Sequence, residues 1–246
     1  MSQNRHTFSI IIPTFQEEKI LERTLAQFSP ELKKEYGMEV IVSDGGSTDT
    51  TLSIAQKYAD KIIEADPAVH QTIAVGRNVG ALAADAEILV FIDADVMIDK
   101  INSFFAILRQ TMQTVNIVAV TCNVRVYQAE EGMSDLLFHQ FYNKYFYFLN
   151  VIGIGMGRGE CQVIRRSVFQ DLNGYKESMA AGEDFDMFSR LKKRGKICFA
   201  HTLTVRESPR RFRKYGYLYI SGMWFLNAMS VWLFRKSAVK EWKPVR

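Results

Sequence analysis

ILVFIDAD, residues 88–95, joins five apolar side chains to two carboxylates spaced i, i+2. An apolar run of this length predicts one central strand of a parallel sheet. Ligands of open α/β sheets bind beyond the carboxyl ends of the strands, and residues i and i+2 of an extended chain point to the same side. Asp93 and Asp95 are therefore predicted to face one ligand from the edge of the sheet.

Two carboxylates in that position suit a hard divalent cation. Mg²⁺ or Mn²⁺ takes one or two protein carboxylates and completes its coordination with water and substrate phosphates. Asp93 and Asp95 thus indicate a metal-bound nucleotide diphosphate. The alternative is that an aspartate after a strand forms a turn or caps a helix.

Apolar runs alternate with segments of helical spacing on both sides of this strand. The predicted strands are residues 8–12, 38–42, 61–64, 87–92 and 117–126, and the predicted helices are residues 17–28, 50–58, 72–84 and 101–112. Such alternation predicts a mostly parallel α/β sheet flanked by helices. An aromatic segment (134–152), a glycine-rich loop (153–159), a helix (184–194) and a strand (197–200) follow.

Composition narrows the class of protein. The chain has 246 residues and fits one large domain, residues 1–204, with a tail, residues 205–246. Its three cysteines form no cluster, which argues against zinc or disulfides and favours a cytoplasmic setting. No secretory signal is apparent at the N-terminus. The motifs of Walker-type NTPases and Rossmann dehydrogenases are absent.

Three further motifs combine a plausible ligand-binding role with a structural alternative. DGGSTDT (44–50) follows a strand, so Asp44 can accept hydrogen bonds from a base or ribose, but the segment can also simply cap a helix. Arg77 could hold a phosphate or lie solvated on its helix. GEDFD (182–186) opens a helix, and the helix dipole favours acidic residues there. The functional alternative is that one of its carboxylates serves as a general base.

Six motifs in this order resemble those of the family 2 glycosyltransferases, whose GT-A fold has a Rossmann-like sheet. They are PTFQE (13–17), DGGSTD (44–49), GRN (76–78), DAD (93–95), RR-x-x-F-x-x-x-NGY (165–175) and GED (182–184), and they cover about residues 8–200. Two positions depart from the family pattern: Gln16, where asparagine is usual, and Asn173, where many members have glycine.

The resemblance implies that a sugar moves from a UDP- or GDP-type sugar donor to an acceptor hydroxyl. The residues that would border the nucleoside are Pro13, Phe15, Glu17 and Asp44. Arg77 would lie near the base or the phosphates, Asp93 would meet the ribose or the metal, and Asp95 the metal, Mn²⁺ or Mg²⁺.

The resemblance also implies an inverting mechanism of the hexosyltransferase type. Asp184 would be the catalytic base, supported by Glu183, and would take the proton of the acceptor hydroxyl as it attacks the anomeric carbon. The metal would stabilise the departing diphosphate. Two rivals remain: a non-catalytic scaffold that binds nucleotide sugars at the membrane, and a sugar-phosphate nucleotidyltransferase.

The tail is basic and aromatic. From residue 201 onward the net charge is +8, against −4 before it, and residues 215–234 carry no charge. An interfacial membrane helix is preferred over a helix packed on the protein and over a transmembrane span. Within the tail, the SPRRF stretch (208–212) resembles the tail of a small subgroup of bacterial family 2 enzymes, in which a basic residue can close over the diphosphate.

The acceptor side is predicted from the aromatic segment, Phe138–Phe148, which is alternatively a core helix. Together with the tail it suggests a glycan or lipid-linked acceptor and a peripheral enzyme at the inner face of the cell membrane, in cell-envelope glycan biosynthesis. A homodimer and the absence of nucleic-acid binding complete the expectations.

Overall fold

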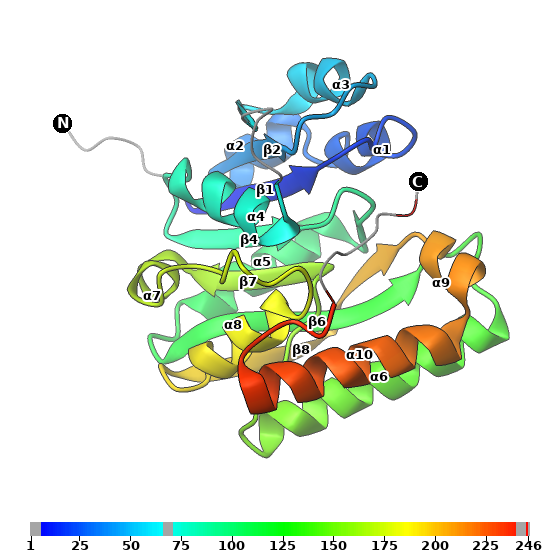
Figure 1. The fold of residues 1–246 in the computed structure, drawn as a ribbon. Helices are drawn as coiled ribbons and strands as arrows, with labels where there is room; N and C mark the ends of the chain where they lie inside the picture. The colour runs from blue at the N-terminus through cyan, green and yellow to red at the C-terminus, as the bar shows by residue number, and fades with distance from the viewer. Residues whose placement is uncertain (1–5, 66–70, 240–244, 246) are drawn as a thin grey trace.

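The computed structural model describes residues 6–65, 71–239 and 245. Within them, one eight-stranded sheet runs through the molecule in the order β3-β2-β1-β4-β7-β6-β8-β5 (Figure 1). The strands are β1 (Phe8–Thr14), β2 (Met38–Asp44), β3 (Lys61–Glu64), β4 (Ile88–Ile92), β5 (Met97–Ile98), β6 (Ile117–Val126), β7 (Cys161–Arg165) and β8 (Lys196–Glu207). The predicted α/β class and mixed, mostly parallel sheet are confirmed.

The first half of the sheet is parallel and contains a change of winding direction. β1 pairs with β2 on one side and with β4 on the other, both in parallel. The chain therefore reverses its winding direction at β1, which opens a crevice beyond the carboxyl ends of the strands. Thr14, at the end of β1, and Asp93, directly after β4, meet at this edge.

The second half contains a strand that periodicity did not predict. β7 is antiparallel to β4, with Cys161 opposite Ile92. The residues just before β7 are thereby brought to the carboxyl end of β4, where the Asp93 amide donates to the Glu160 carbonyl at 3.4 Å. β8 is also longer than predicted: it continues past Ala200 to Glu207 after an irregularity in its pairing with β6.

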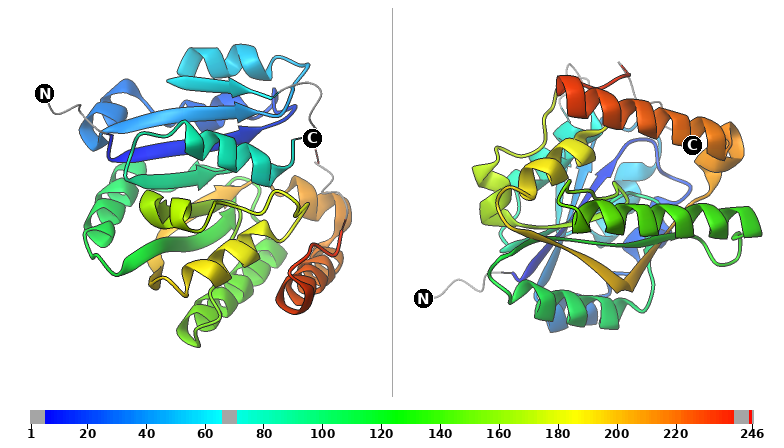
Figure 2. Two further views of the ribbon diagram at one scale, coloured as in Figure 1. Left: turned by 60° about the vertical axis from the view of Figure 1, so that its left-hand side comes forward. Right: turned by 90° about the horizontal axis from the view of Figure 1, so that it is seen from below.

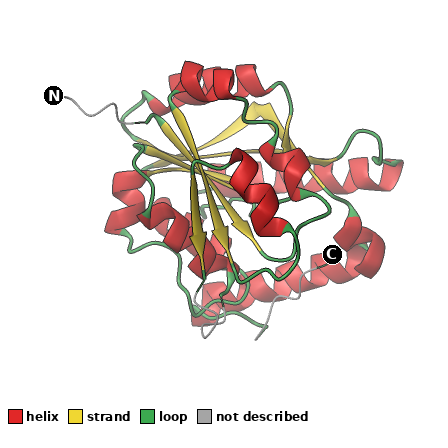
Figure 3. Cartoon of the chain, turned by 90° about the horizontal axis from the view of Figure 1, so that it is seen from above, coloured by secondary structure: helices red, strands yellow, loops and turns green. Residues whose placement is uncertain are grey.

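Helices cover both faces of the sheet (Figure 3). One core lies under α1 (Leu21–Leu25), α2 (Pro30–Tyr36), α3 (Thr51–Tyr58) and α5 (Ile101–Met112). The opposite core lies under α4 (Ile73–Leu82), α7 (Arg166–Asp171) and α8 (Glu183–Leu191). The helix predicted at 17–28 is wrong in length, because the chain turns after Leu25 and starts α2 at Ser29-Pro30, where the Ser29 hydroxyl accepts from the Leu32 amide.

The aromatic segment forms α6 (Met133–Val151), which lies against β6 and β8. Asn143, buried on its inner side, exchanges two 3.0 Å hydrogen bonds with the Val124 backbone. After β8 the chain forms α9 (Arg210–Tyr215), turns at Gly216 with a φ of 78°, and continues as α10 (Tyr217–Phe234). The tail is thus two helices rather than one, and the predicted boundary at residue 204 falls inside β8.

α10 runs alongside α6, as Figure 1 and the right-hand view of Figure 2 show. Trp224 of α10 packs its ring against Phe138 and Tyr142 of α6, with centroids 5.8 and 5.0 Å apart. Asp135 of α6, almost fully buried, accepts from Arg213 at 2.9 Å and from the Tyr217 hydroxyl. One carboxylate thus fastens both tail helices to α6.

Asp135 should make the stability of the protein depend on pH in the acidic range. Burial opposes its ionisation, but hydrogen bonds from Arg213, Tyr217 and Gly132 lower its pKa to about 2. A carboxylate with a lowered pKa stabilises the folded state above its unfolded pKa, about 4, and loses that contribution as the pH falls towards 2.

We expect Asp135→Asn to lower the free energy of unfolding in urea at pH 7, and to lower it by less at pH 3. Asp171→Asn, an exposed aspartate on α7, is the matched control and should change little at either pH. An equal loss at both pH values would mean that the charge of Asp135 does not hold the tail.

Candidate active site

A cavity of about 370 Å³ lies beyond the carboxyl ends of β1 and β4. Its wall combines a highly charged half with an aromatic half. The charged half includes Glu17, Arg77, Asp93, Asp95, Arg158, Glu160, Glu183, Asp184, Glu207, Arg210 and Arg211. Pro13 and Phe15, from the β1 end, also line the cavity, so most of the predicted site residues share one space.

Asp93 and Asp95 follow β4 directly and remain partly accessible, with 28% and 17% of their side chains exposed. Burial raises the pKa of Asp93 to about 7; Arg77 opposes this rise and Asp95 adds to it. Burial likewise raises the pKa of Asp95 to about 6, although Arg210 lowers it. Each carboxylate thus combines partial burial with an arginine partner, Arg77 for Asp93 and Arg210 for Asp95.

Arg77 is buried, so the alternative of a solvated arginine is wrong. Its guanidinium donates to Asp93 at 2.9 Å, to Glu183 at 2.8 Å and to the Gly159 carbonyl at 2.9 Å. α4 can bring it there because Gly80 lets the helix approach β1: a Cβ on Gly80 would lie 2.5 Å from the Ile11 side chain. Arg77 thus joins three separate segments of the cavity wall.

Asp184 and Glu183 start α8 but face different partners. Glu183 is engaged by Arg77, whereas the Asp184 carboxylate accepts from the Phe185 amide at 2.8 Å and lines the cavity. Burial and the neighbouring Glu183 raise the pKa of Asp184 well above its usual range. Gly182, with a φ of 79°, makes the tight turn that presents the pair.

Gly159 lies close to three charged groups of the cavity wall. A Cβ at this position would lie 3.7 Å from the Asp184 carboxylate, 3.9 Å from the Asp93 carboxylate and 3.4 Å from the Arg77 guanidinium. Because glycine has no side chain, the space between the Asp93 and Asp184 carboxylates beside Gly159 is not filled by this residue.

Arg210 bridges the tail to the β1 loop. Its guanidinium donates to both carboxylate oxygens of Glu17, at 2.9 and 3.0 Å, and lies 3.2 Å from Asp95. One basic residue of the SPRRF segment, Arg210, therefore lies directly beside the candidate metal ligand Asp95. A ligand with its own cation and phosphates would offer Asp95 and Arg210 new partners of opposite charge.

Asp44 differs from the other predicted residues, because it does not line the cavity. Its fully buried carboxylate accepts from Thr14 at 2.9 Å and from the Ser47 hydroxyl at 2.6 Å, and the Gly46 and Ser47 amides donate to it at 3.0 and 2.7 Å. In this structure Asp44 holds the loop after β2, whereas the predicted alternative, a helix cap from this segment, is not formed: the N-cap of α3 is Thr50, whose side chain makes no capping hydrogen bond. Direct contact with a nucleoside stays a prediction.

A second charged cluster was not predicted. Arg158 donates to Glu160 at 2.5 Å and to Glu207 at 2.7 Å, and its Cζ lies 5.4 Å from the centre of the Trp224 ring. Burial and Glu160 raise the pKa of Glu207 well above its usual range. The glycine-rich loop before Glu160 was the available signal, because glycine allows the backbone to approach a ligand closely.

The aromatic half of the cavity comes from the helices of the second half of the fold. It is formed by Phe146 of α6, Phe185 of α8, Phe212 of α9, and Trp224 with Asn227 of α10. The wall of the cavity thus combines charged groups with aromatic rings, and Phe185 follows Asp184 directly in the chain.

The family assignment rests on sequence. The profile described as "Glycosyl transferase family 2" matches residues 9–172, which is more than half of the chain. The chain belongs to glycosyl transferase family 2. The match includes the Asp93-Ala94-Asp95 segment and ends before Asp184, so the latter residue lies outside the matched range.

Two curated relatives of this family 2 member are similar over parts of their length. Validoxylamine A glucosyltransferase of Streptomyces hygroscopicus subsp. limoneus is 35% identical over 94 residues, 36% of this chain and 20% of that protein. Succinoglycan biosynthesis protein ExoA of Rhizobium meliloti is 26% identical over 200 residues, 76% of this chain and 58% of that protein. The matches thus span less than two thirds of either relative.

Solved structures of glycosyltransferases share the fold. The mannosyltransferase PcManGT of Pyrobaculum calidifontis, solved with GDP-Man and Mn²⁺, superposes with a TM-score of 0.66 at 19% identity, covering 83% of this chain and 57% of that one. The expected GT-A fold is confirmed.

Gly159 gives a direct test of the cavity in this family 2 glycosyltransferase. Its backbone is outside the left-handed region and the added methyl would meet ordinary van der Waals contacts, so Gly159→Ala should change the stability by less than about 1 kcal/mol. The methyl would fill the space between Asp93 and Asp184. We expect the turnover of nucleotide sugar to fall on the order of 10²-fold.

Gly222→Ala is the control, because a Cβ at Gly222 on α10 meets nothing within 4 Å. Nucleoside diphosphate release and thermal melting measure the two effects. Unchanged turnover in Gly159→Ala would show that the reaction does not occur at this point of the cavity.

Proposed function

We propose that this protein transfers a sugar from a UDP- or GDP-type nucleotide sugar to an acceptor hydroxyl, with inversion at the anomeric carbon. The observation that carries the proposal is that Asp93, Asp95 and Asp184 line one cavity, with Gly159 between the first and the last. Family membership supports the class of reaction, and the relatives named above are glycosyl-transferring or glycan-forming proteins by name.

The donor would occupy the charged half. Pro13 and Phe15 would border the nucleoside, and Arg210 could leave Glu17 to contact the diphosphate as a bidentate donor. Arg77 is less available for a phosphate, because Asp93, Glu183 and Gly159 already engage it. Its role in the proposal is to hold the wall of the donor site.

A divalent cation fits Asp95 and Asp93 as ligands. Among the described residues no group of three acidic, histidine or cysteine side chains is arranged to hold a metal. Mn²⁺ or Mg²⁺ needs only one or two carboxylates when phosphates and water complete its shell. The position of both aspartates in the cavity wall, directly after β4, supports a cation that arrives with the diphosphate. Bound there, it would neutralise charge on the leaving diphosphate.

Asp184 would act as the base. A carboxyl group with a raised pKa is a stronger proton acceptor than an ordinary one, which favours this role for Asp184. Its partner Glu183 is held by Arg77, which leaves Asp184 as the member of the pair with access to an acceptor hydroxyl.

The acceptor would enter beside the aromatic half. Phe146, Phe185 and Trp224 favour a glycan, whose rings stack on aromatic side chains, or a lipid-linked sugar. Such acceptors belong to cell-envelope glycan biosynthesis, and the name of ExoA is consistent with that setting. Peripheral membrane attachment and a homodimer are part of the same proposal.

Removing the base should abolish turnover without removing the donor. We expect Asp184→Asn to lower the rate of sugar transfer by about 10²–10⁴-fold, the usual contribution of a general base. The affinity for nucleoside diphosphate should stay within a few-fold. Steady-state kinetics and titration calorimetry measure the two quantities, and proton NMR of the product reports its anomeric configuration.

Glycosidic product of retained configuration would contradict the inverting mechanism. Equal activity of wild type and Asp184→Asn would remove Asp184 from the reaction. Full donor binding with no turnover in either protein, across donors and acceptors, would favour the scaffold alternative.

The metal is tested separately. With UDP-, GDP- or dTDP-sugars at about 100 times Kd, binding should stabilise the protein by roughly 2.7 kcal/mol. We expect the thermal shift to require Mn²⁺ or Mg²⁺ and to be lost in Asp95→Asn. Asp171→Asn, outside the cavity, should keep it. A full shift in the presence of a chelator would contradict the metal site.

A further inference from the structure

Exposed apolar side chains are concentrated on one part of the molecule. Of the twenty large apolar residues that are exposed in the described part of the chain, seventeen lie on α6, on α10 or directly after α6. We call these the α6–α10 surface: Met133, Leu137, Phe141, Tyr145, Tyr147, Phe148, Val151, Ile152, Ile154, Leu218, Tyr219, Phe225, Leu226, Met229, Trp232, Leu233 and Phe234. Monomeric proteins rarely leave so many apolar groups together without a partner.

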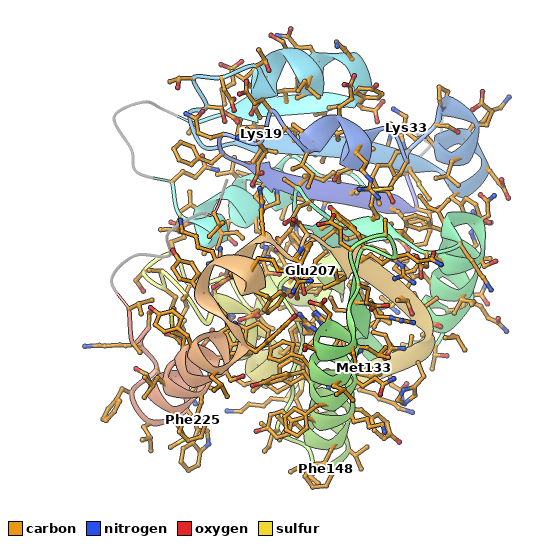
Figure 4. All side chains as sticks on the ribbon, turned by 90° about the vertical axis from the view of Figure 1, so that its right-hand side faces the viewer. Lys19, Lys33, Met133, Phe148, Glu207 and Phe225 are labelled. Atoms are coloured by element: carbon orange, nitrogen blue, oxygen red, sulfur yellow. The ribbon has the colours of Figure 1, made fainter. Side chains whose placement is uncertain are left out.

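α6 and α10 cover each other's apolar side chains only on the sides that face each other. Phe138 of α6 packs against Tyr217 and Trp224 of α10, with ring centroids 4.8 and 5.8 Å apart. The residues on the outer side have no such cover: Phe225 is 64% and Trp232 73% exposed. Figure 4 shows Phe148 and Phe225 at the same end of the molecule, pointing away from the sheet.

The charges on this surface favour an anionic partner. α10 carries no charged residue, and Lys214 before it and Arg235 with Lys236 after it are exposed. Lys144 is exposed between the aromatic residues of α6. Asp135, the acidic residue of α6, is buried and paired with Arg213. Cations at both ends of an apolar helix, without exposed acids along it, are typical of helices that lie on anionic lipid.

The same helices do not provide a membrane span. No helix in the described residues has the length and hydropathy needed to cross a bilayer. Tyrosine and tryptophan, both present on the α6–α10 surface, prefer the boundary between headgroups and acyl chains. The surface therefore matches the interface of a bilayer rather than its interior.

We propose that the α6–α10 surface docks on an anionic lipid bilayer, with both helices lying in the plane of the headgroups. This inference deepens the proposed function, on which its acceptor assignment rests, because it names the surface that would bring the enzyme to a lipid-linked acceptor. The docking itself depends only on the exposed apolar residues and the flanking cations.

α10 connects the docking surface to the cavity. Its inner residues Trp224 and Asn227 line the cavity wall. A Cβ on Gly182, the residue that turns the chain into Glu183-Asp184, would lie 3.0 Å from the Val231 side chain of α10. A bilayer under α10 would thus lie next to the end of the cavity that holds Asp184. The acceptor class that fits is a hydroxyl group carried on a lipid headgroup or lipid-linked sugar.

Flotation of the full chain with vesicles tests the docking. Wild type should float with vesicles containing phosphatidylglycerol and much less with pure phosphatidylcholine. The double variant Phe225→Glu/Trp232→Glu should bind at least about ten-fold more weakly, since each removes an inserted aromatic ring. Leu82→Glu, which replaces an exposed leucine on α4 away from this surface, is the matched control and should bind as wild type does.

The basic residues have a separate signature. Each Lys or Arg near an anionic surface strengthens binding by about five-fold. Arg235→Gln/Lys236→Gln should therefore weaken binding to anionic vesicles by about 25-fold and leave the weak binding to phosphatidylcholine unchanged. Binding of the wild type should decrease as salt is raised.

Several outcomes would overturn the proposal. Failure of the wild type to float with anionic vesicles would do so, as would an equal loss in Leu82→Glu. A wild type that is dimeric by light scattering and becomes monomeric in Phe225→Glu/Trp232→Glu, without flotation, would assign the surface to a second copy. Donor binding measured by thermal shift without vesicles tests the proposed function independently, so the two failures can be told apart.

Discussion

The arrangement of the site depends on the interactions of Arg77. It lies in α4, yet its partners belong to the end of β4, the loop before β7 and the start of α8. Although burial disfavours its charge, Asp93 and Glu183 raise the pKa of Arg77, so the cation is permanent. Removing one member of a buried ion pair typically costs about 3–5 kcal/mol, because the other is left uncompensated. The carboxylates of the cavity can exist together because this guanidinium lies between them.

The charge of Arg77 gives neighbouring acidic residues different partners. Glu183 is bound to Arg77 and Asp184 is not, although the two are adjacent in sequence. Asp93 is bound to Arg77, whereas Asp95, two residues on, is within 3.2 Å of Arg210. One fixed arginine and one on the tail therefore give four carboxylates four environments. The second arginine belongs to α9, which is joined to α6 by the Arg213–Asp135 ion pair and to the β1 loop by the Arg210–Glu17 ion pair.

The sequence predicted those site residues whose signal lies in one short stretch of chain, and it missed those that depend on distant strand pairing. Asp93 and Asp95 could be found because a buried strand and two acids are contiguous, and parallel strand ends meet at one edge. Glu160 and Glu207 could not, since they reach the cavity through the antiparallel pairing of β7 and the irregular course of β8, which no short pattern reports. Asp44 was predicted to face a ligand because it also ends a strand, but its four hydrogen bonds with Thr14, Gly46 and Ser47 depend on the folded loop and could not be predicted from that pattern. Gly216 ends one tail helix and starts another, which hydropathy alone does not register.

α10 is both a wall of the cavity and the outer layer of the molecule, so the two are separated by the thickness of one helix. An α-helix with its side chains is about 10 Å across. If the outer face rests on a membrane, as proposed, the reacting hydroxyl would stand about this far above it. The enzyme would then select acceptors by the height at which their hydroxyl is carried as well as by its chemistry. A sugar close to its anchor would be within reach, and one on a long chain would have to fold back.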